Sequence, residues 1–206
     1  MSITFIIILA TAAVSIPAFN NRTLFYKLDF SPFIVEKNKE WYRFITHAFL
    51  HADWMHLIFN MLVLFFFGDV TQQHFEAYVG LKGIFYYIIL YFGGIAIAVL
   101  PTYKKNKDNP SYHSVGASGA VSAVLFSSVI FSPSRSICLW GVLCFPGIVW
   151  AIIYLVYSYV QSKREGGYIN HDAHFWGAIF GIVFTFLMIP QSSTAFINEI
   201  LALLPF

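Results

Sequence analysis

The chain has 206 residues, of which 58% are hydrophobic and only 11% are charged, with a formal net charge of +2 at pH 7. A typical soluble protein is about 25% charged, so these few charges exclude an ordinary water-soluble globule of this size. Lys and Arg do not cluster with interleaved aromatic residues, so nucleic acid is not an expected partner. We therefore expect the lipid bilayer to surround much of the chain.

Six uncharged stretches are candidates for helices that span the membrane. A spanning helix needs about 20 largely apolar residues, because the hydrocarbon layer is about 30 Å thick. The stretches predict an all-α, polytopic membrane protein with six transmembrane helices, folded as a single domain over residues 1–206. They comprise residues 1–21, 54–68, 83–103, 109–134, 136–162 and 173–198.

The first two stretches need separate comment. Residues 1–21 contain no Lys or Arg. A cleaved signal peptide begins with a positively charged region, so we expect this stretch to be retained as the first helix. The stretch 54–68 is short for a span and carries Asn60 in its middle, so hydropathy supports it less than the other five.

Charged residues gather in three segments between the stretches. The segment 22–53 is the longest, and long segments of this kind often have a functional role. Together with 102–113 and 163–172, it holds ten of the twelve Lys and Arg residues. The positive-inside rule would place these segments in the cytoplasm. The tail 191–206 is mildly amphipathic, and we expect it to lie at the membrane interface.

Neither the cysteines nor a pair of closely spaced histidines indicates a metal site. Cys138 and Cys144 lie in one apolar stretch and are interpreted as small core side chains, so we do not expect a disulfide. His47 and His51 have the spacing of two metal ligands on a helix, but the Glu of the H-E-x-x-H motif is missing. We expect no metal and no cofactor.

Polar side chains recur near the start of the second, fourth and sixth stretches. Such side chains are costly inside lipid, so each one suggests a functional role. Helices two, four and six would cross the membrane in the same direction, which puts the three groups at one depth on one side. The groups are His56 and Asn60, then Ser118, and then His171, Asp172 and His174. We predict that four of these residues face one shared site, namely Ser118, His174, His56 and Asn60.

Glycines suggest how two of these helices approach each other. Gly177 and Gly181 form a G-x-x-x-G pair one turn after His174, and the fourth stretch carries Gly116 and Gly119. Small residues let helices pack closely in lipid. By itself the pair indicates only helix packing, since it is frequent in membrane spans. Beside His174 it favours direct contact between a serine hydroxyl and the imidazole.

Ser118 and His174 together indicate nucleophilic catalysis. A serine hydroxyl becomes a strong nucleophile only when a positioned base takes its proton, and a neutral imidazole is such a base. Asp172 lies two residues from His174 and hence on another face of the helix, so we expect a dyad rather than a triad. His56, Asn60 and the backbone N–H of Ser118 would stabilise the oxyanion.

These motifs resemble those of the rhomboid family, which are six-helix intramembrane serine proteases. The resemblance extends from about residue 41 to residue 181 and includes the end of a long first loop. It implies a serine endopeptidase that cleaves transmembrane segments of other membrane proteins, with Ser118 and His174 as its dyad. The motifs are G-x-S-G at Gly116–Gly119, H-x-x-x-N at His56–Asn60, and A-H-x-x-G-x-x-x-G at Ala173–Gly181.

The resemblance also implies an integral protein of a bacterial plasma membrane whose active site opens to the outer side. This conflicts with the positive-inside count, to which we give less weight because a long first loop weakens that rule. Two positions depart from the family pattern. Gln72 stands where many members have Glu, and Ser122 stands where some members have an aromatic residue that stacks on the base. Another group must therefore hold His174.

Two other functional classes stay open. A catalytically inactive relative would only bind membrane proteins, although the intact Ser118 and His174 argue against it. A channel or transporter would use the intramembrane His and Asn side chains as a polar path, and its flux would not depend on Ser118. Metallo- and aspartyl proteases are disfavoured, because the sequence lacks H-E-x-x-H and paired intramembrane aspartates. The sequence assigns neither a natural substrate nor an oligomeric state.

Overall fold

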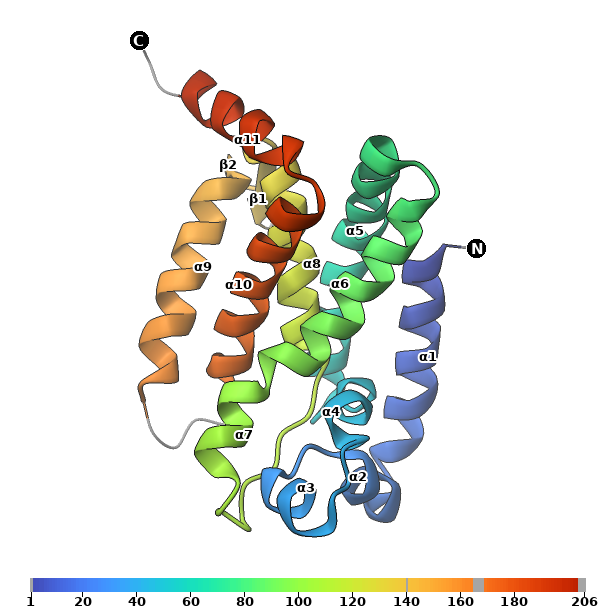
Figure 1. Cartoon of the computed structure of the whole chain (residues 1–206). Coiled ribbons are helices and arrows are strands. Elements are labelled where there is room, and N and C mark those ends of the chain that lie inside the picture. The colour runs from blue at the N-terminus through green and yellow to red at the C-terminus, as the bar shows by residue number, and fades with distance from the viewer. Residues whose placement is uncertain (1, 140, 165–168, 204–206) are drawn as a thin grey trace.

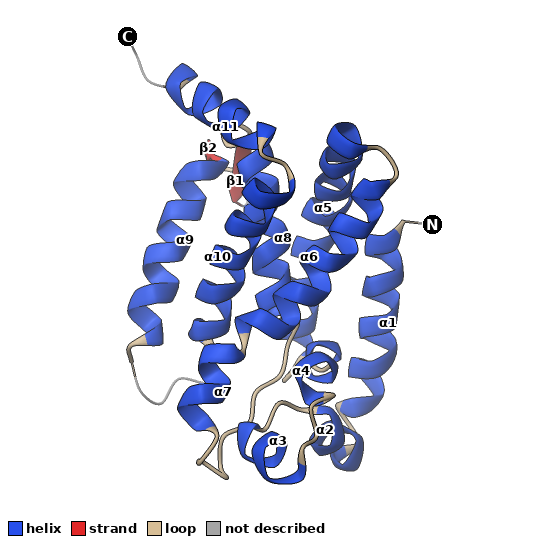
Figure 2. Ribbon diagram, in the orientation of Figure 1, coloured by secondary structure: helices blue, strands red, loops and turns tan. Residues whose placement is uncertain are grey.

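The computed structural model describes residues 2–139, 141–164 and 169–203. The described chain is mostly helical (Figure 1), as predicted, but it also contains one small two-stranded hairpin (Figure 2) that the prediction of an all-α protein did not include. In chain order the elements are α1 (Ile3–Ala18), α2 (Arg22–Leu28), α3 (Pro32–Asn38), α4 (Arg43–Thr46), the 3-10 turn η1 (His47–Phe49), α5 (Trp54–Val79), α6 (Lys82–Ala98), α7 (Leu100–Asn106), α8 (Ser118–Phe131), β1 (Ser136–Leu139), β2 (Leu143–Pro146), α9 (Gly147–Ser162), α10 (His171–Met188) and α11 (Gln191–Ala202).

Among the described residues, two helices are long and apolar enough to cross a membrane, namely α5 and α6 continued by α7. Their most apolar windows have mean hydropathies of 1.5 and 2.1. α10 and α11 together would form a third span, but their axes are bent by 114° at the break between them. α1, α8 and α9 are apolar but have 16, 14 and 16 residues, fewer than the roughly 20 of a full span. Length and apolarity thus support two or three spans, and the count of six stays a prediction.

α5 is longer, and α8 shorter, than the uncharged stretches that predicted them. α5 continues to Val79 and stops at Gly80, where a φ of 63° suits a glycine at a helix end. α8 begins only at Ser118, because the residues before it pair with the first loop. Phe30 N donates to Ser114 O at 2.9 Å, and Ser114 N donates to Phe30 O at 3.0 Å.

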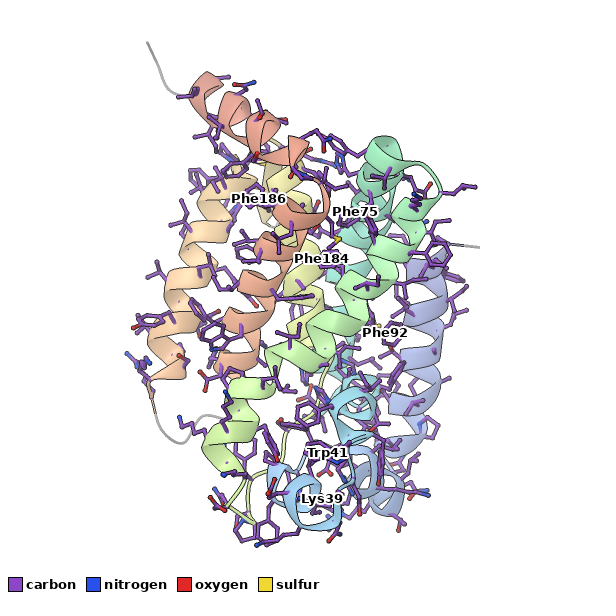
Figure 3. All side chains as sticks on the ribbon, viewed as in Figure 1. Lys39, Trp41, Phe75, Phe92, Phe184 and Phe186 are labelled. Atoms are coloured by element: carbon purple, nitrogen blue, oxygen red, sulfur yellow. A yellow bond between two sulfur atoms is a disulfide. The ribbon has the colours of Figure 1, made fainter. Side chains whose placement is uncertain are left out.

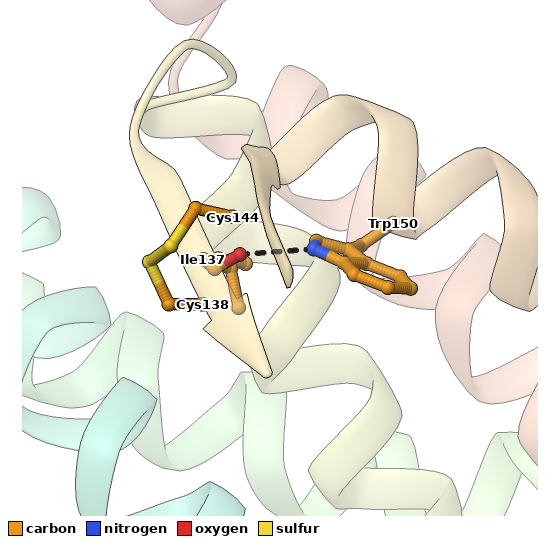
Figure 4. Close-up of a disulfide and its surroundings, with 4 residues drawn as sticks. All are labelled: Ile137, Cys138, Cys144 and Trp150. Atoms are coloured by element: carbon orange, nitrogen blue, oxygen red, sulfur yellow. Dashed lines mark hydrogen bonds between the residues drawn. A yellow bond between two sulfur atoms is a disulfide. The ribbon is translucent and has the colours of Figure 1, made fainter. Parts of the chain in front are cut away.

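The chain after α8 folds into a β-hairpin rather than continuing into a helix. β1 and β2 pair antiparallel, and Gly141 between them has a left-handed φ of 70°. This reversal brings Cys138 opposite Cys144, and the two form a disulfide (Figure 4). Both cysteines are exposed, so the prediction of unpaired core cysteines is wrong. The hairpin is tied to α9, because Trp150 Nε1 donates to Ile137 O at 2.9 Å.

The last predicted span, 173–198, is not one helix but parts of two, α10 and α11. α10 ends at Met188, and Pro190 precedes α11. A proline cannot continue a helix regularly because it lacks the N–H donor. α11 turns across the end of the bundle that carries the hairpin (Figure 1), and its Glu199 accepts a hydrogen bond from Ser134 Oγ at 2.6 Å. The tail is described as far as residue 203, and its place at a membrane interface stays a prediction.

α8 lies at the centre of the bundle, in contact with α5, α6 and α10. Phe75 of α5 and Phe184 of α10 pack edge to face with ring centroids 6.2 Å apart (Figure 3). Lys39 and Trp41 lie beside α3 and α4, at the end of the molecule far from α11 (Figure 3). α5, α8 and α10 all begin toward this end (Figure 1). Their three N-terminal turns can therefore face one site.

Candidate active site

The residues before Ser118 fix its position. Gly116 has a φ of 123°, a conformation that glycine adopts without strain, and its N–H donates to His47 O at 3.0 Å. The N–H of Ala117 donates to His51 Nε2 at 3.5 Å. Ser118 then begins α8. The first N–H groups of this helix have no partner within it, so they are available to an anion.

His56 lies directly against the backbone of Gly116. A Cβ atom added at Gly116 would be 2.6 Å from His56 Cε1 and 2.7 Å from His56 Nε2. The N–H of Ala52 donates to His56 Nδ1 at 3.4 Å. A neutral imidazole that accepts at Nδ1 carries its proton on Nε2. His56 therefore presents an N–H donor beside the backbone that leads to Ser118.

Asn60 lies one turn further along α5 and is buried. Its Nδ2 donates to His56 O at 2.9 Å. An amide nitrogen carries two protons, so one is left for another acceptor. The start of this helix is itself fixed, because Asp53 Oδ1 accepts a hydrogen bond from His56 N at 2.8 Å.

α8 and α10 pack backbone against backbone. A Cβ atom added at Gly177 would be 2.2 Å from Gly119 O, and one added at Gly181 would be 2.2 Å from Ala123 O. Approach this close requires small residues on both helices. His174 lies one turn before Gly177, at the end of this contact nearest Ser118.

A cavity of about 610 Å³ brings the predicted polar residues together. Ser118 of α8, His174 of α10, and His56 and Asn60 of α5 all line it. Within the described part of the chain, no hydrogen bond joins the Ser118 hydroxyl to the His174 imidazole. Catalytic contacts of this kind often tighten only when a substrate is bound. The apolar side chains in the walls include Phe25, Met55, Phe59, Val63, Val121, Leu125 and Ile169.

Tyr154 of α9 also lines the cavity, and it was not predicted from the sequence. Its ring lies nearly parallel to the imidazole of His174, with an interplanar angle of 18° and a centroid distance of 6.2 Å. The Tyr154 hydroxyl forms a hydrogen bond of 2.6 Å with Ser122 Oγ. The sequence indicated only that some group must replace an aromatic residue at position 122. Tyr154, Tyr157 and Tyr159 are all close in sequence, so the pattern could not single one out.

His171 and Asp172 lie outside the walls of this cavity. The His171 ring packs edge-on against Tyr157, with centroids 5.5 Å apart, and lies 5.6 Å from the His174 ring. His171 Nδ1 is buried and has no hydrogen-bond partner among the described residues. His171 is thus a neighbour of His174 and does not face Ser118 across the cavity.

A buried ion pair within the first loop also contacts the segment before Ser118, through His113. Arg43 Nη1 donates to Asp29 Oδ1 at 2.6 Å, and both side chains are buried. Asp29 Oδ2 lies 2.5 Å from Nδ1 of His113, a residue that lines the cavity. Burial raises the pKa of Asp29 above 3.8, while the hydrogen bond and charge of His113 and the charge of Arg43 oppose the increase. The loop therefore supports one wall of the cavity.

His47 and His51 make separate hydrogen bonds to the protein. His47 Nδ1 is 2.9 Å from Arg43 O, and His51 Nδ1 is 2.9 Å from Ser15 Oγ. Burial lowers the pKa of His47 to about 4 and that of His51 to about 3, so both rings are neutral at pH 7. Within residues 2–139, 141–164 and 169–203, no group of three His, Cys, Asp or Glu side chains could hold a metal ion.

Comparison with known proteins places the chain in a family. Residues 38–191 match the family model of the Rhomboid domain. The chain belongs to the rhomboid family. This rhomboid is 30% identical to Rhomboid-like protein 11, chloroplastic, of Arabidopsis thaliana over 159 residues, which are 72% of this chain and 52% of that protein.

Two further relatives are also named as rhomboids. YdcA of Bacillus subtilis, which is provisionally named a rhomboid protease, is 27% identical over 162 residues, or 75% of this rhomboid and 70% of YdcA. RHOMBOID-like protein 12, mitochondrial, of Arabidopsis thaliana is 26% identical over 142 residues, or 65% of this chain and 42% of that protein. This rhomboid thus spans about half the length of the plant relatives it matches.

Proposed function

We propose that this rhomboid is an intramembrane serine endopeptidase that cleaves transmembrane segments of other membrane proteins. The observation that carries the proposal is the shared cavity. Ser118, His174, His56 and Asn60 come from three different helices and line one space of about 610 Å³. A hydroxyl, an imidazole and two further N–H donors facing one space are the groups that acyl transfer needs.

Ser118 is the nucleophile and His174 is the base in this mechanism. The neutral imidazole takes the hydroxyl proton as Ser118 Oγ bonds to the scissile carbonyl carbon. The resulting imidazolium then donates this proton to the leaving amine as the C–N bond breaks. A water molecule then attacks the acyl group while the His174 imidazole takes its proton. The imidazole returns this proton to Ser118 Oγ as the second product leaves, which restores the free serine.

His56, Asn60 and the backbone N–H of Ser118 stabilise the oxyanion of the tetrahedral intermediate. The Nε2–H of His56 and the second Nδ2–H of Asn60 are available for this role, as their hydrogen bonds indicate. The positive end of the α8 dipole acts in the same direction. Preorganised donors of this kind lower the barrier because they need no reorganisation when the charge develops.

The apolar walls of the cavity suit a substrate that arrives from lipid. Phe59, Val121 and Leu125 are among the side chains that line it. Lipid tails are as apolar as these walls, so apolar substrate side chains can leave lipid and pack against the walls without loss, gaining van der Waals contact. Transmembrane segments supply such side chains, so membrane proteins are the substrate class that we expect, and we expect no cofactor.

Labelling with a fluorophosphonate probe tests the assignment of the nucleophile. The probe phosphonylates only activated serines, so the adduct should map to the peptide that contains Ser118. Ser118→Ala should abolish labelling and His174→Ala should slow it strongly. Ser128→Ala is the matched control, because Ser128 is a buried serine of the same helix outside the cavity. An adduct elsewhere, or labelling that does not depend on His174, would contradict the proposal.

We further propose that the chain resides in a bacterial plasma membrane with its catalytic end outside, as the family resemblance implies. Two observations oppose this orientation. Ten of the twelve Lys and Arg residues lie in the loops of the catalytic end, and the Cys138–Cys144 disulfide at the other end would persist only in an oxidising compartment.

Cysteine labelling decides the orientation. Ser111→Cys and Val142→Cys, each made in a Cys138→Ser/Cys144→Ser background, place one exposed thiol at either end. An outward catalytic end predicts that a membrane-impermeant maleimide labels position 111 in intact cells and position 142 only after permeabilisation. The reverse pattern would put the catalytic end in the cytoplasm.

A further inference from the structure

The His174 imidazole is oriented by packing against other rings. Within the described residues, its side chain makes no hydrogen bond, and the rings nearest to it are those of Tyr154 and His171. The Tyr154 ring is nearly parallel to it, while the His171 ring stands at 77°. A base must present one nitrogen to the nucleophile in a defined orientation, so the group that fixes the plane of this ring affects catalysis.

Tyr154 is itself fixed at both ends. Its ring lies over His174, and its hydroxyl forms the 2.6 Å hydrogen bond with Ser122 Oγ. Ser122 is buried on α8, one turn after Ser118. The ring also packs against Phe126 of the same helix, with centroids 5.6 Å apart. Tyr154 thus connects the helix of the nucleophile to the ring of the base.

Tyr154 belongs to α9, a helix whose other side chains are largely exposed. Ile152, Ile153 and Val156 of α9 are 56%, 52% and 58% exposed, as expected for side chains that face lipid. The residues of α9 that are buried are Gly147, Ala151 and Ser158. Tyr154 is half-buried between Ala151 and Ser158, and it joins α9 to both helices of the proposed dyad through its contacts with Ser122 and His174.

We infer that Tyr154 is a positioning residue for the catalytic base, and that Ser122 holds Tyr154 in place. The inference rests on the proposed function of Ser118 and His174. Tyr154 orients the imidazole by stacking, which favours offset, near-parallel rings. Because the residue belongs to α9, the alignment of the base depends on where α9 lies relative to α8. A displacement of α9 would release the base while the nucleophile stays in place.

Steady-state cleavage of a transmembrane substrate in proteoliposomes, measured from pH 5 to 9, tests this inference. Tyr154→Leu should lower kcat at least about tenfold with KM within about twofold, because misplacing a reacting group by about 1 Å can cost 10²-fold. Its acid limb in the pH–kcat profile should shift as well. Tyr154→Phe keeps the ring but loses the hydrogen bond to Ser122, so it should lower kcat only about threefold. Ser122→Ala should also lower kcat about threefold, because it removes the same hydrogen bond that holds the Tyr154 hydroxyl.

Tyr157→Leu is the matched control, since Tyr157 lies one turn further along α9 and packs on His171. It should leave kcat and the pH profile unchanged. Tyr154→Leu with wild-type kcat and pH profile would overturn the inference. A kcat of Tyr154→Phe as low as that of Tyr154→Leu would also overturn it. So would a Tyr154→Leu variant in which only KM changes. If Tyr154→Leu fails to fold, a wild-type kcat in both Ser122→Ala and Tyr154→Phe would overturn the inference. Cleavage that survives Ser118→Ala would instead overturn the proposed function.

Discussion

Gly177 of α10 lies so close to Gly119 of α8 that a Cβ atom on Gly177 would be 2.2 Å from the Gly119 carbonyl oxygen. Gly181 and Ala123 repeat this contact one turn later. His174 and Ser118, the proposed base and nucleophile, are therefore carried by two helices whose backbones touch. The distance between the two helices depends on glycine at positions 177 and 181.

Gly177→Ala should destabilise the protein, because the added methyl group meets backbone atoms that cannot move independently. Overpacking of this kind typically costs about 1–3 kcal/mol, and activity should fall with it. Thermal unfolding in detergent measures the change. Gly93→Ala is the control, because the three atoms nearest to its added methyl group all belong to a side chain, the Phe180 ring, the nearest at 2.8 Å. An equal loss of stability in both variants would show that the backbone contact has no special role.

His56→Ala and Asn60→Ala should each lower turnover without abolishing it. Each substitution removes one donor to the oxyanion, and such donors are worth about 10²–10³ in kcat, so we expect losses of about 10–10³. Single-turnover cleavage assays measure the effect directly. Unchanged turnover in both variants would assign these two residues a structural role.

His174→Ala should be inactive, whereas His171→Ala should retain much of its activity. His174 lines the cavity that holds Ser118, while His171 lies outside its walls against Tyr157. The same cleavage assay distinguishes the two variants, and a pull-down of the substrate separates lost binding from lost chemistry. Activity that survives in His174→Ala but not in His171→Ala would move the dyad toward the surface.

Stability should fall as the pH drops from about 6.5 toward 4, because His47 must become charged in a buried place. Burial lowers its pKa from 6.5 to about 4, so the unfolded state binds more protons over this range. Stability is then fully present above pH 6.5 and declines below it, by up to roughly 3 kcal/mol from this residue. Unfolding temperatures of wild type and His47→Gln across pH 4–8 measure this contribution. Parallel losses in both proteins would contradict it.

The sequence predicted the convergence of the site better than the lengths of the helices. Polar residues in lipid are costly, so Ser118, His174, His56 and Asn60 stood out, and the order of the spans gave them a common direction. All four line one cavity. Their catalytic roles remain proposals that the assays above test.

The bounds of the helices were harder to predict, because an uncharged stretch need not be one helix. Local backbone features divide these stretches, such as the left-handed Gly141 of the hairpin and Pro190 between α10 and α11. The Cys138–Cys144 pair was missed for the same reason, since only the strand register brings the two residues together. Tyr154 was missed because its role depends on the rotation of α9 about its axis, which hydropathy does not report.

Cleavage of a transmembrane substrate by the reconstituted protein, with wild type compared to Ser118→Ala, is the most direct test of whether Ser118 is the nucleophile. The substitution removes one oxygen atom from a half-buried side chain, so the variant should fold normally. We predict that wild type and Ser128→Ala cleave the substrate within its membrane segment and that Ser118→Ala does not. Cleavage by Ser118→Ala at the wild-type rate would contradict the assignment of Ser118 as the nucleophile.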